Sequence, residues 1–302
     1  MNLPPLSTRR PPRTSLHRLV LSLGVSVLVL QGTSSSRGAS SYSTPAIVPT
    51  KPLSLFNGRD LDGFYTWIPR SGYADPDRVF TVVDQVDGAP AIRISGQHDG
   101  GLITRENYAN YHLVVEFRYG VITWASRKNN ARDSGILLHG QGEDGGYRQD
   151  FKSPWLRSVE FQIIEGGTGD LLLLGGLTPG SAERINTRLT IPVTPGTQTW
   201  NPEGTPKTFF SGRIDWFGRD PRWKNQLGFR GSRDAEKPVG EWNRLEAICA
   251  EGNLTFLVNG VKVNEGKDGN LREGRILFQS EGAEIYFRRI ELLPLSDAPN
   301  TR

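Results

Sequence analysis

The chain has 302 residues, of which 36 are Lys or Arg and 32 are Asp or Glu, giving a formal charge of +4. The positive excess lies in the first forty residues, which hold five arginines and no acidic residue, so the remainder carries 31 basic against 32 acidic side chains. A nucleic-acid partner would favour a strong positive field. We therefore expect no nucleic-acid partner for the body of the protein.

The first forty residues have the pattern of an export signal. A basic, proline-rich start leads into the apolar run 19–30, and small residues follow it. This run is too short to span a bilayer comfortably and has the length of a signal-peptide core. We predict a signal peptide over 1–40, a linker over 41–51, and a secreted or periplasmic protein of a bacterial envelope that meets the membrane only through this signal.

Cys249 is the single cysteine of the chain, so no intramolecular disulfide can form. Export without disulfides fits a bacterial envelope protein whose core is large enough to fold unaided. Cys249 alternates with apolar residues in the segment 245–249. This pattern favours a buried small hydrophobic side chain over a nucleophile.

The body of the chain predicts one all-β domain over 52–295, followed by a tail over 296–302. The chain holds 35 Gly and 20 Pro, no long segment keeps a helical apolar period, and short runs alternate apolar and polar residues. Many short strands separated by turns indicate a sandwich or a barrel. The clearest runs are 79–83, 91–94, 112–119, 135–139, 159–164, 245–249, 254–258, 275–278 and 284–292.

A tight hairpin is predicted over 254–263. Asn259 and Gly260 lie between two alternating runs. Both residue types accept the positive φ angles of a type I′ turn, which joins two antiparallel strands directly.

The segment from about 168 to 237 lacks the alternation of apolar and polar residues that the other segments show. It is rich in Gly, Pro and Thr and then gathers six aromatic residues among arginines: Phe209, Phe210, Trp216, Phe217, Trp223 and Phe229. Such interleaving can mark a single-stranded nucleic-acid surface, or it can anchor a long loop onto the core. In a neutral, exported domain we favour an ordered loop insertion that covers the sandwich and shapes its binding cleft.

One stretch, 158–165, is the most informative about function. Because side chains alternate across a strand, Glu160 and Gln162 share one face while Phe161 and its neighbours point into the core. His139 ends another apolar run, and Gln279 and Glu281 share a face of a third. We expect these five polar residues to line one concave sheet. Carboxylates and amides there would bind sugar hydroxyls bidentately, while Trp rings stack on the sugar.

Other chemistries find little support. Beyond the export segment the histidines are His98, His112 and His139, with no paired spacing, which argues against a zinc site. Neither a G-x-S-x-G elbow nor a P-loop occurs. We assign no metal-binding residues and no firm cofactor. Assistance of catalysis by a divalent cation is left as an alternative.

Seven short motifs run in order through 53–293. They resemble the signatures of the 3-keto-disaccharide hydrolase domain family, long a domain of unknown function, which has a concanavalin-like jelly-roll fold. The resemblance implies an all-β, lectin-like sandwich of two antiparallel sheets with a long loop insertion. Asp133 and Arg289 replace family asparagines, and His139 stands where an arginine is frequent. The motifs are L-F-N-G-R-D-L-D-G at 55–63, D-S-G at 133–135, E-F-Q-I at 160–163, G-E-W-N at 240–243, V-N-G at 258–260, F-Q-S-E-G at 278–282 and F-R-R-I at 287–290.

The resemblance implies hydrolysis of a saccharide oxidised to a ketone at C3. Such a sugar has an acidic proton at C2, so a base, an acid for the leaving oxygen and an oxyanion stabiliser suffice. From their expected common face and the motif match, we assign Glu160 or His139 as base and Glu281 as acid. The ketone and hydroxyls would be bound by Gln162, Gln279 or Arg288. Further contacts to the substrate are assigned to Ser134 and Trp216.

Two alternatives use the same residues. The pattern Glu160-x-Gln162-x-x-Glu165 resembles the E-x-D-x-x-E strand of laminarinase-type β-glucanases, whose outer Glu residues act as nucleophile and acid/base of a retaining reaction. Gln162 would replace the middle Asp of that pattern. A non-catalytic, lectin-like module would use every one of these side chains as a ligand for hydroxyls.

Overall fold

The computed structural model describes residues 45–178 and 180–298. The predicted signal over 1–40, the start of the linker and the last four residues of the tail lie outside this range. Within it, no helix is both long and apolar enough to cross a membrane. The helical elements of the described ranges are two short 3-10 turns, η1 (Ala125–Arg127) and η2 (Leu295–Asp297).

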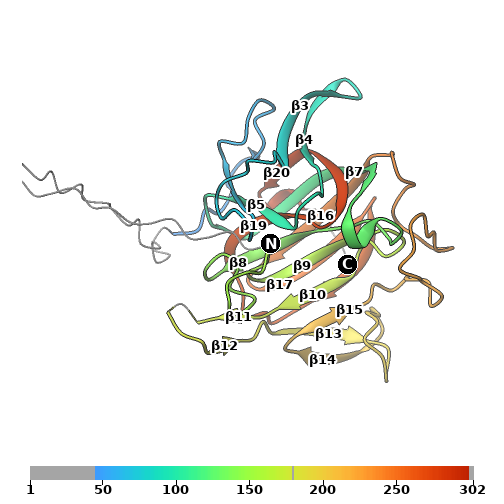
Figure 1. The fold of residues 1–302 in the computed structure, drawn as a ribbon. Helices are drawn as coiled ribbons and strands as arrows, with labels where there is room; N and C mark the ends of the chain where they lie inside the picture. The colour runs from blue at the N-terminus through green and yellow to red at the C-terminus, as the bar shows by residue number, and fades with distance from the viewer. Residues whose placement is uncertain (1–44, 179, 299–302) are drawn as a thin grey trace, which may run out of the picture. The chain divides into compact units, whose positions relative to one another are not determined.

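The described strands form two large antiparallel sheets, shown in Figure 1. The first runs β18-β17-β16-β7-β20-β4-β3, with β1 paired to β20. Its strands are β1 (Leu53–Ser54), β3 (Phe80–Val86), β4 (Ala89–Ile94), β7 (Tyr111–Thr123), β16 (Asn243–Ala250), β17 (Asn253–Val258), β18 (Val261–Gly266) and β20 (Ala283–Leu293).

The second sheet runs β15-β10-β9-β8-β19-β5-β2, with β6 paired to β19. Every strand predicted from alternation lies in one of these two sheets, which confirms the predicted sandwich. The strands of the second sheet are β2 (Phe64–Trp67), β5 (Gly100–Thr104), β6 (Tyr108–Ala109), β8 (Asp133–Gln141), β9 (Arg157–Ile164), β10 (Leu171–Leu174), β15 (Gly212–Ile214) and β19 (Glu273–Ser280).

The segment 168–237 is more regular than a loop. It holds β10 and β15, which extend the second sheet beyond β9, and two small two-stranded sheets. These are β11 (Gly176–Leu177) with β12 (Arg184–Ile185), and β13 (Leu189–Val193) with β14 (Thr205–Phe209). The insertion is therefore built onto the edge of the sheet that carries Glu160, and its strands β13 to β15 lie at the bottom of Figure 1.

Two local predictions are confirmed. Asn259 and Gly260 both have positive φ angles, 49° and 83°, and join β17 to β18. Cys249 is buried in the core, and burial raises the pKa of its thiol to about 12. Both outcomes follow from local chemistry that the sequence displays directly.

Aromatic side chains from both sheets fill the space between them. Phe161 of β9 stacks on Phe256 of β17, with ring centroids 4.2 Å apart and planes at 2°. Phe278 of β19 packs edge-on against Phe287 of β20 at 5.1 Å. All four are fully buried, so these ring pairs tie β9 and β19 to the opposite sheet.

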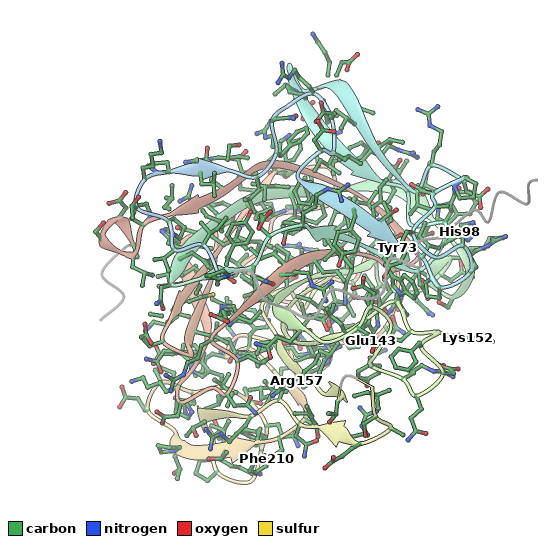
Figure 2. The ribbon with its side chains drawn as sticks, turned by 90° about the vertical axis from the view of Figure 1, so that its left-hand side faces the viewer. Tyr73, His98, Glu143, Lys152, Arg157 and Phe210 are labelled. Atoms are coloured by element: carbon green, nitrogen blue, oxygen red, sulfur yellow. The ribbon has the colours of Figure 1, made fainter. Side chains whose placement is uncertain are left out.

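Replacing Phe161 by Ala is expected to destabilise the protein by about 3–5 kcal/mol, because it removes a buried ring and leaves a cavity. Urea unfolding followed by tryptophan fluorescence measures this loss. Phe210 is 53% exposed and lies low in the view of Figure 2, so Phe210→Ala is the control, with a change within about 0.5 kcal/mol. Equal effects of the two substitutions would contradict the assigned core.

Candidate functional site

The candidate site lies on the face of the second sheet that points away from the core, here called the outer face. Leu137 of β8 pairs with Glu160 of β9, and Gly135 pairs with Gln162. Directly paired residues project to the same side. The outer face therefore carries Glu160 and Gln162, while Phe161 between them faces the core.

Part of the outer face is apolar. Leu137 and Leu277 alternate with core residues of β8 and β19, and with Ile103, Leu156 and Leu174 they form a second, smaller buried cluster. Trp67 donates its Nε1–H to the carbonyl of Ser153 at 3.0 Å. The segment around 142–156 thus closes this half of the face, and the polar residues lie beside an apolar wall.

Gly135 makes room for the central contact of the site. A Cβ atom placed on it would come within 2.6 Å of Oε1 of both Gln279 and Glu160. The two side chains therefore meet over the bare backbone of this glycine. Gln279 Oε1 is buried and has no hydrogen-bond partner among the described residues. A buried acceptor without a partner is what a bound hydroxyl group would satisfy.

Gln162 belongs to a chain of polar contacts beside Glu160. Its amide nitrogen donates to Asp133 and, at 3.1 Å, to the carbonyl of Ser134. Asp133 pairs with Arg127, which also donates to Glu281 at 2.9 Å. On the other side, Gln162 Oε1 accepts from Arg213 at 3.2 Å.

The same series of polar contacts continues to Asp170, which is fully buried. Its carboxylate pairs with Arg213 at 2.8 Å and with Arg219, and it accepts the backbone N–H of Trp216 at 2.9 Å. This series of polar contacts runs from Glu281 to Arg219 and contains three carboxylates and three guanidinium groups. We call this set of residues the paired network: Glu281, Arg127, Asp133, Gln162, Arg213, Asp170 and Arg219.

Glu160 is not a member of the paired network. It is 4% exposed and forms no ion pair with any described residue. Burial raises the pKa of Glu160 to about 8, and the charge of Glu281 acts in the same direction, while Arg213 and a hydrogen bond with Gln279 oppose it. Burial also raises the pKa values of Asp133 and Glu281, against the charge of Arg127. Glu160 can therefore exchange a proton near neutral pH.

The structure brings together four of the predicted site residues: Glu160, Gln162, Gln279 and Glu281. Ser134 lies beside them but faces inward, and its hydroxyl donates to the carbonyl of Gln279 at 2.9 Å. Its observed contact therefore holds β19 against β8. The sequence reasoning did not assign Arg127, Asp170 and Arg213 to the site, and Asp133 appeared there only as part of a motif.

The prediction that His139 shares this face is wrong. β8 is irregular between Leu138 and Gln141, and His139 has a φ of 54°. This bulge turns the ring away from the outer face and against Tyr111 of β7, at 5.5 Å between ring centroids. Burial lowers the pKa of His139 to about 4, so the imidazole is a neutral part of the core.

Arg288 and Trp216 also lie elsewhere than predicted. Arg288 is on β20 of the first sheet, where it pairs with Glu116 at 2.7 Å and covers the ring of Trp242 at 3.9 Å. Trp216 is 4% exposed and belongs to the main core cluster. Neither side chain is placed to contact a substrate beside Glu160.

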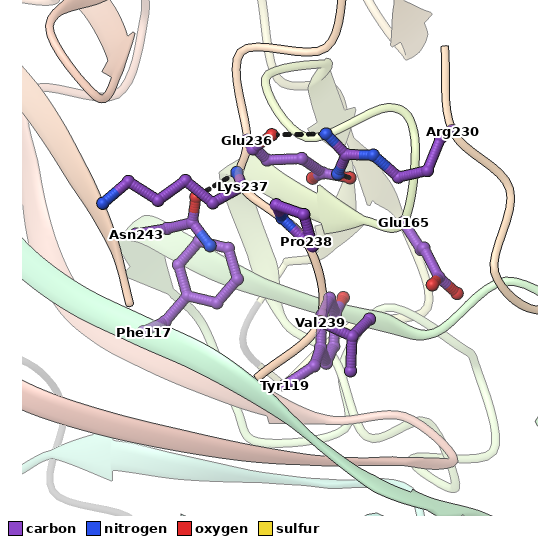
Figure 3. Close-up of a pocket in the computed structure, with 9 residues that line it drawn as sticks. All are labelled: Phe117, Tyr119, Glu165, Arg230, Glu236, Lys237, Pro238, Val239 and Asn243. Atoms are coloured by element: carbon purple, nitrogen blue, oxygen red, sulfur yellow. Dashed lines mark hydrogen bonds and ion pairs between the residues drawn. The ribbon is translucent and has the colours of Figure 1, made fainter. Parts of the chain in front are cut away.

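Glu165 follows β9 and lies on the opposite side from Glu160. The two strands β8 and β9 keep a regular register from Glu160 to Ile164, so positions five apart point to opposite faces. Glu165 pairs with Arg132 at 3.0 Å and lines a cavity of about 10 Å³, with Tyr119 of β7 among its walls, shown in Figure 3. A retaining pair needs both carboxyl groups in one cleft, flanking the scissile bond about 5 Å apart. The predicted pair of Glu160 and Glu165 is therefore wrong.

No three His, Cys, Asp or Glu side chains within 45–178 and 180–298 converge in a way that could hold a metal ion. Arginines contact the other acidic groups of the site instead: Arg127 lies between Asp133 and Glu281, and Arg213 joins Asp170 to the amide of Gln162.

Fold and site together define an antiparallel jelly-roll sandwich with a buried carboxyl–amide group on the outer face of one sheet. A sequence-family model, described as a 3-keto-alpha-glucoside-1,2-lyase-like domain, matches residues 51–293. The chain belongs to this family. No curated protein matches the chain significantly.

Three solved structures are among those found to be similar to this chain. A "putative glycosyl hydrolase" from Parabacteroides distasonis is 18% identical, with 81% of this chain and 94% of that chain covered and a TM-score of 0.45. The carbohydrate-binding module CBM66 from Bacillus subtilis is 8% identical, with 70% and 91% covered and a TM-score of 0.38. A β-glucanase from Bacillus licheniformis is 8% identical, with 77% and 98% covered and a TM-score of 0.34.

Glu160→Gln is expected to stabilise the protein in a pH-dependent way. The folded pKa of about 8 exceeds the ordinary 4.5, so between these values the folded state holds a proton that the unfolded chain has released. Stability from this group is present at low pH and is lost as pH rises through 8. The variant should therefore gain roughly 3–5 kcal/mol over wild type at pH 8.5 and little at pH 4.5.

Urea unfolding of both proteins at pH 4.5, 7 and 8.5 measures this difference. Glu236, whose pKa burial raises to about 7, is present in both proteins, so its contribution cancels. A stability difference that does not change with pH would show that Glu160 titrates normally.

Proposed function

We propose that the protein cleaves the glycosidic bond of a 3-keto-glycoside, with Glu160 as general base. The observation that carries this proposal is a buried, unpaired carboxyl group with a pKa of about 8 that meets an amide over Gly135, in a chain whose family is described as 3-keto-alpha-glucoside-1,2-lyase-like. Acidic C–H protons need a base of this strength in a water-poor site.

The proposed reaction proceeds in three steps. Glu160 takes the proton from C2, and the electron pair of that C–H bond moves into a C2–C3 enolate with its negative charge on the C3 oxygen. The enolate then expels the C1 substituent: the C1–O bond breaks, its electron pair stays on the glycosidic oxygen, and that oxygen takes a proton. Water adds across the new C1–C2 double bond, so the net products are an alcohol and a free 3-keto sugar.

The neighbours of Glu160 fit the remaining roles. Glu281, whose pKa is raised by burial, protonates the leaving oxygen. Gln279 offers a buried acceptor for a sugar hydroxyl, and Gln162 lies on the same outer face beside it. The apolar cluster around Leu137 and Leu277 keeps water away from the base.

We predict that the mature domain releases alcohol from a 3-keto-glucoside and not from its unoxidised parent. Below pH 8 the value of kcat/KM should fall about tenfold per pH unit, because Glu160 acts only when deprotonated. Glu160→Gln should lower kcat by at least about 10²-fold. Product release is followed by NMR, with and without chelator, and a loss of activity with chelator would add a divalent cation to the site.

Glu116→Gln is the matched control, because it removes a carboxylate from the first sheet, where Glu116 pairs with Arg288. This variant should keep wild-type turnover. Release from the unoxidised parent would contradict the elimination mechanism. Saturable binding of the sugar without any turnover would favour a lectin-like binding module instead.

We also propose that the chain is exported to the periplasm or beyond. The apolar run 19–30 behind a basic start supports this. When the full chain is expressed, cell fractionation should find the protein outside the cytoplasm, and N-terminal sequencing should show that the first forty or so residues have been removed. A variant lacking residues 1–40 should stay in the cytoplasm, and equal distribution of both forms would contradict export by this segment.

A further inference from the structure

Arg213 is the arginine that the insertion brings to the outer face. β15 pairs with β10, and Leu172 of β10 lies opposite both Arg213 and Glu160. The three residues therefore form one row across adjacent strands, on one side of the sheet. Arg213 and Glu160 are two strands apart, about 10 Å between backbones.

The guanidinium of Arg213 is held in place and still accessible. Nη1 pairs with Asp170 at 2.8 Å, and Nη2 donates to Gln162 Oε1 at 3.2 Å. Asp170 is fully buried, whereas the side chain of Arg213 is 34% exposed. These two contacts fix the planar group, and a guanidinium has five N–H donors in all. A ligand can therefore reach donors whose orientation is set before it binds.

The other two arginines of the paired network are less exposed than Arg213 and contact other groups. Arg127 is 15% exposed and bridges Asp133 and Glu281. Arg219 is 11% exposed and lies over the ring of Trp223 at 4.3 Å while it pairs with Asp170. Arg213 is the most exposed of the three, and its charge acts on Glu160, Asp133 and Glu281 alike.

We propose that Arg213 is a catalytic residue that binds the C3 oxygen of the substrate and stabilises the negative charge that forms there in the enolate. This inference rests on the proposed function. The proton leaves C2 for Glu160, the electron pair moves toward the C3 oxygen, and an N–H of Arg213 donates to that oxygen. Gln162, held by Arg213, adds a second polar group on the same side.

The position of Arg213 suits this role for an electrostatic reason. A fixed cation lowers the energy of a charge that appears only in the transition state, and it costs no reorganisation at that moment. Asp170 balances the charge of Arg213 in the resting protein, so the guanidinium is stable there without substrate. Because β15 belongs to the insertion, this segment contributes to the reaction and not only to the shape of the cleft.

The test compares Arg213→Gln and Arg213→Lys with Arg219→Gln, which removes the other partner of Asp170. For each folded variant, kcat and KM are measured on a 3-keto-glucoside across pH, together with exchange of the C2 proton in deuterated water by NMR. Arg213→Gln should lower kcat and C2 exchange by about 10²–10³-fold. It should also move the rise of kcat/KM to higher pH, because Glu160 loses a nearby cation.

Arg213→Lys should restore part of both effects, since it keeps the charge and loses the fork of donors. Arg219→Gln should lower the melting temperature and leave the pH dependence in place. Wild-type kcat and pH dependence in folded Arg213→Gln would overturn the role of Arg213 and leave the proposed function standing. Absence of both turnover and C2 exchange in the wild-type protein would overturn the proposed function, and this inference with it.

Discussion

The site depends on the two-sided character of β9. On one side Phe161 stacks on Phe256 of the opposite sheet, and on the other side Glu160 and Gln162 project from the outer face. A shift of one residue in the register of β9 would expose the ring and bury both polar groups in the core. The energy that holds the sandwich together therefore also fixes where the carboxyl group lies.

The contact between Glu160 and Gln279 also depends on Gly135. Gly135 sits opposite Gln162 on β8, and the absence of a side chain there lets Glu160 and Gln279 approach from neighbouring strands. A larger residue would separate them by occupying the space of both Oε1 atoms. The site is thus defined by one missing side chain as much as by those present.

The sequence predicted the fold well because its signals are local. Alternation identified the main strands, and Asn259-Gly260 identified a hairpin whose φ angles are both positive. The same local reasoning placed Glu160, Gln162, Gln279 and Glu281 together, since each lies on a strand, or directly after one, with one apolar face. These features need no knowledge of which strands become neighbours.

The errors come from information that local patterns do not carry. His139 follows an apolar run as a site residue would, but a bulge with a φ of 54° turns it into the core. Arg288 lies on a strand of the right pattern in the other sheet, and sheet membership depends on long-range pairing. Arg213 was missed for the same reason: only the pairing of β15 with β10 brings it beside Gln162.

The charge distribution around Glu160 explains why one carboxyl group differs from its neighbours. Asp133, Asp170 and Glu281 each have an arginine partner, and a buried ion pair of this kind offsets the loss of hydration. Glu160 has amide and apolar neighbours instead, so its ionised form is the costly one. Pairing it with an arginine would stabilise the folded state at high pH but would also lower its basicity. In the proposed reaction Glu160 removes a carbon-bound proton, which requires an unpaired carboxylate, and the folded state is less stable whenever Glu160 is charged.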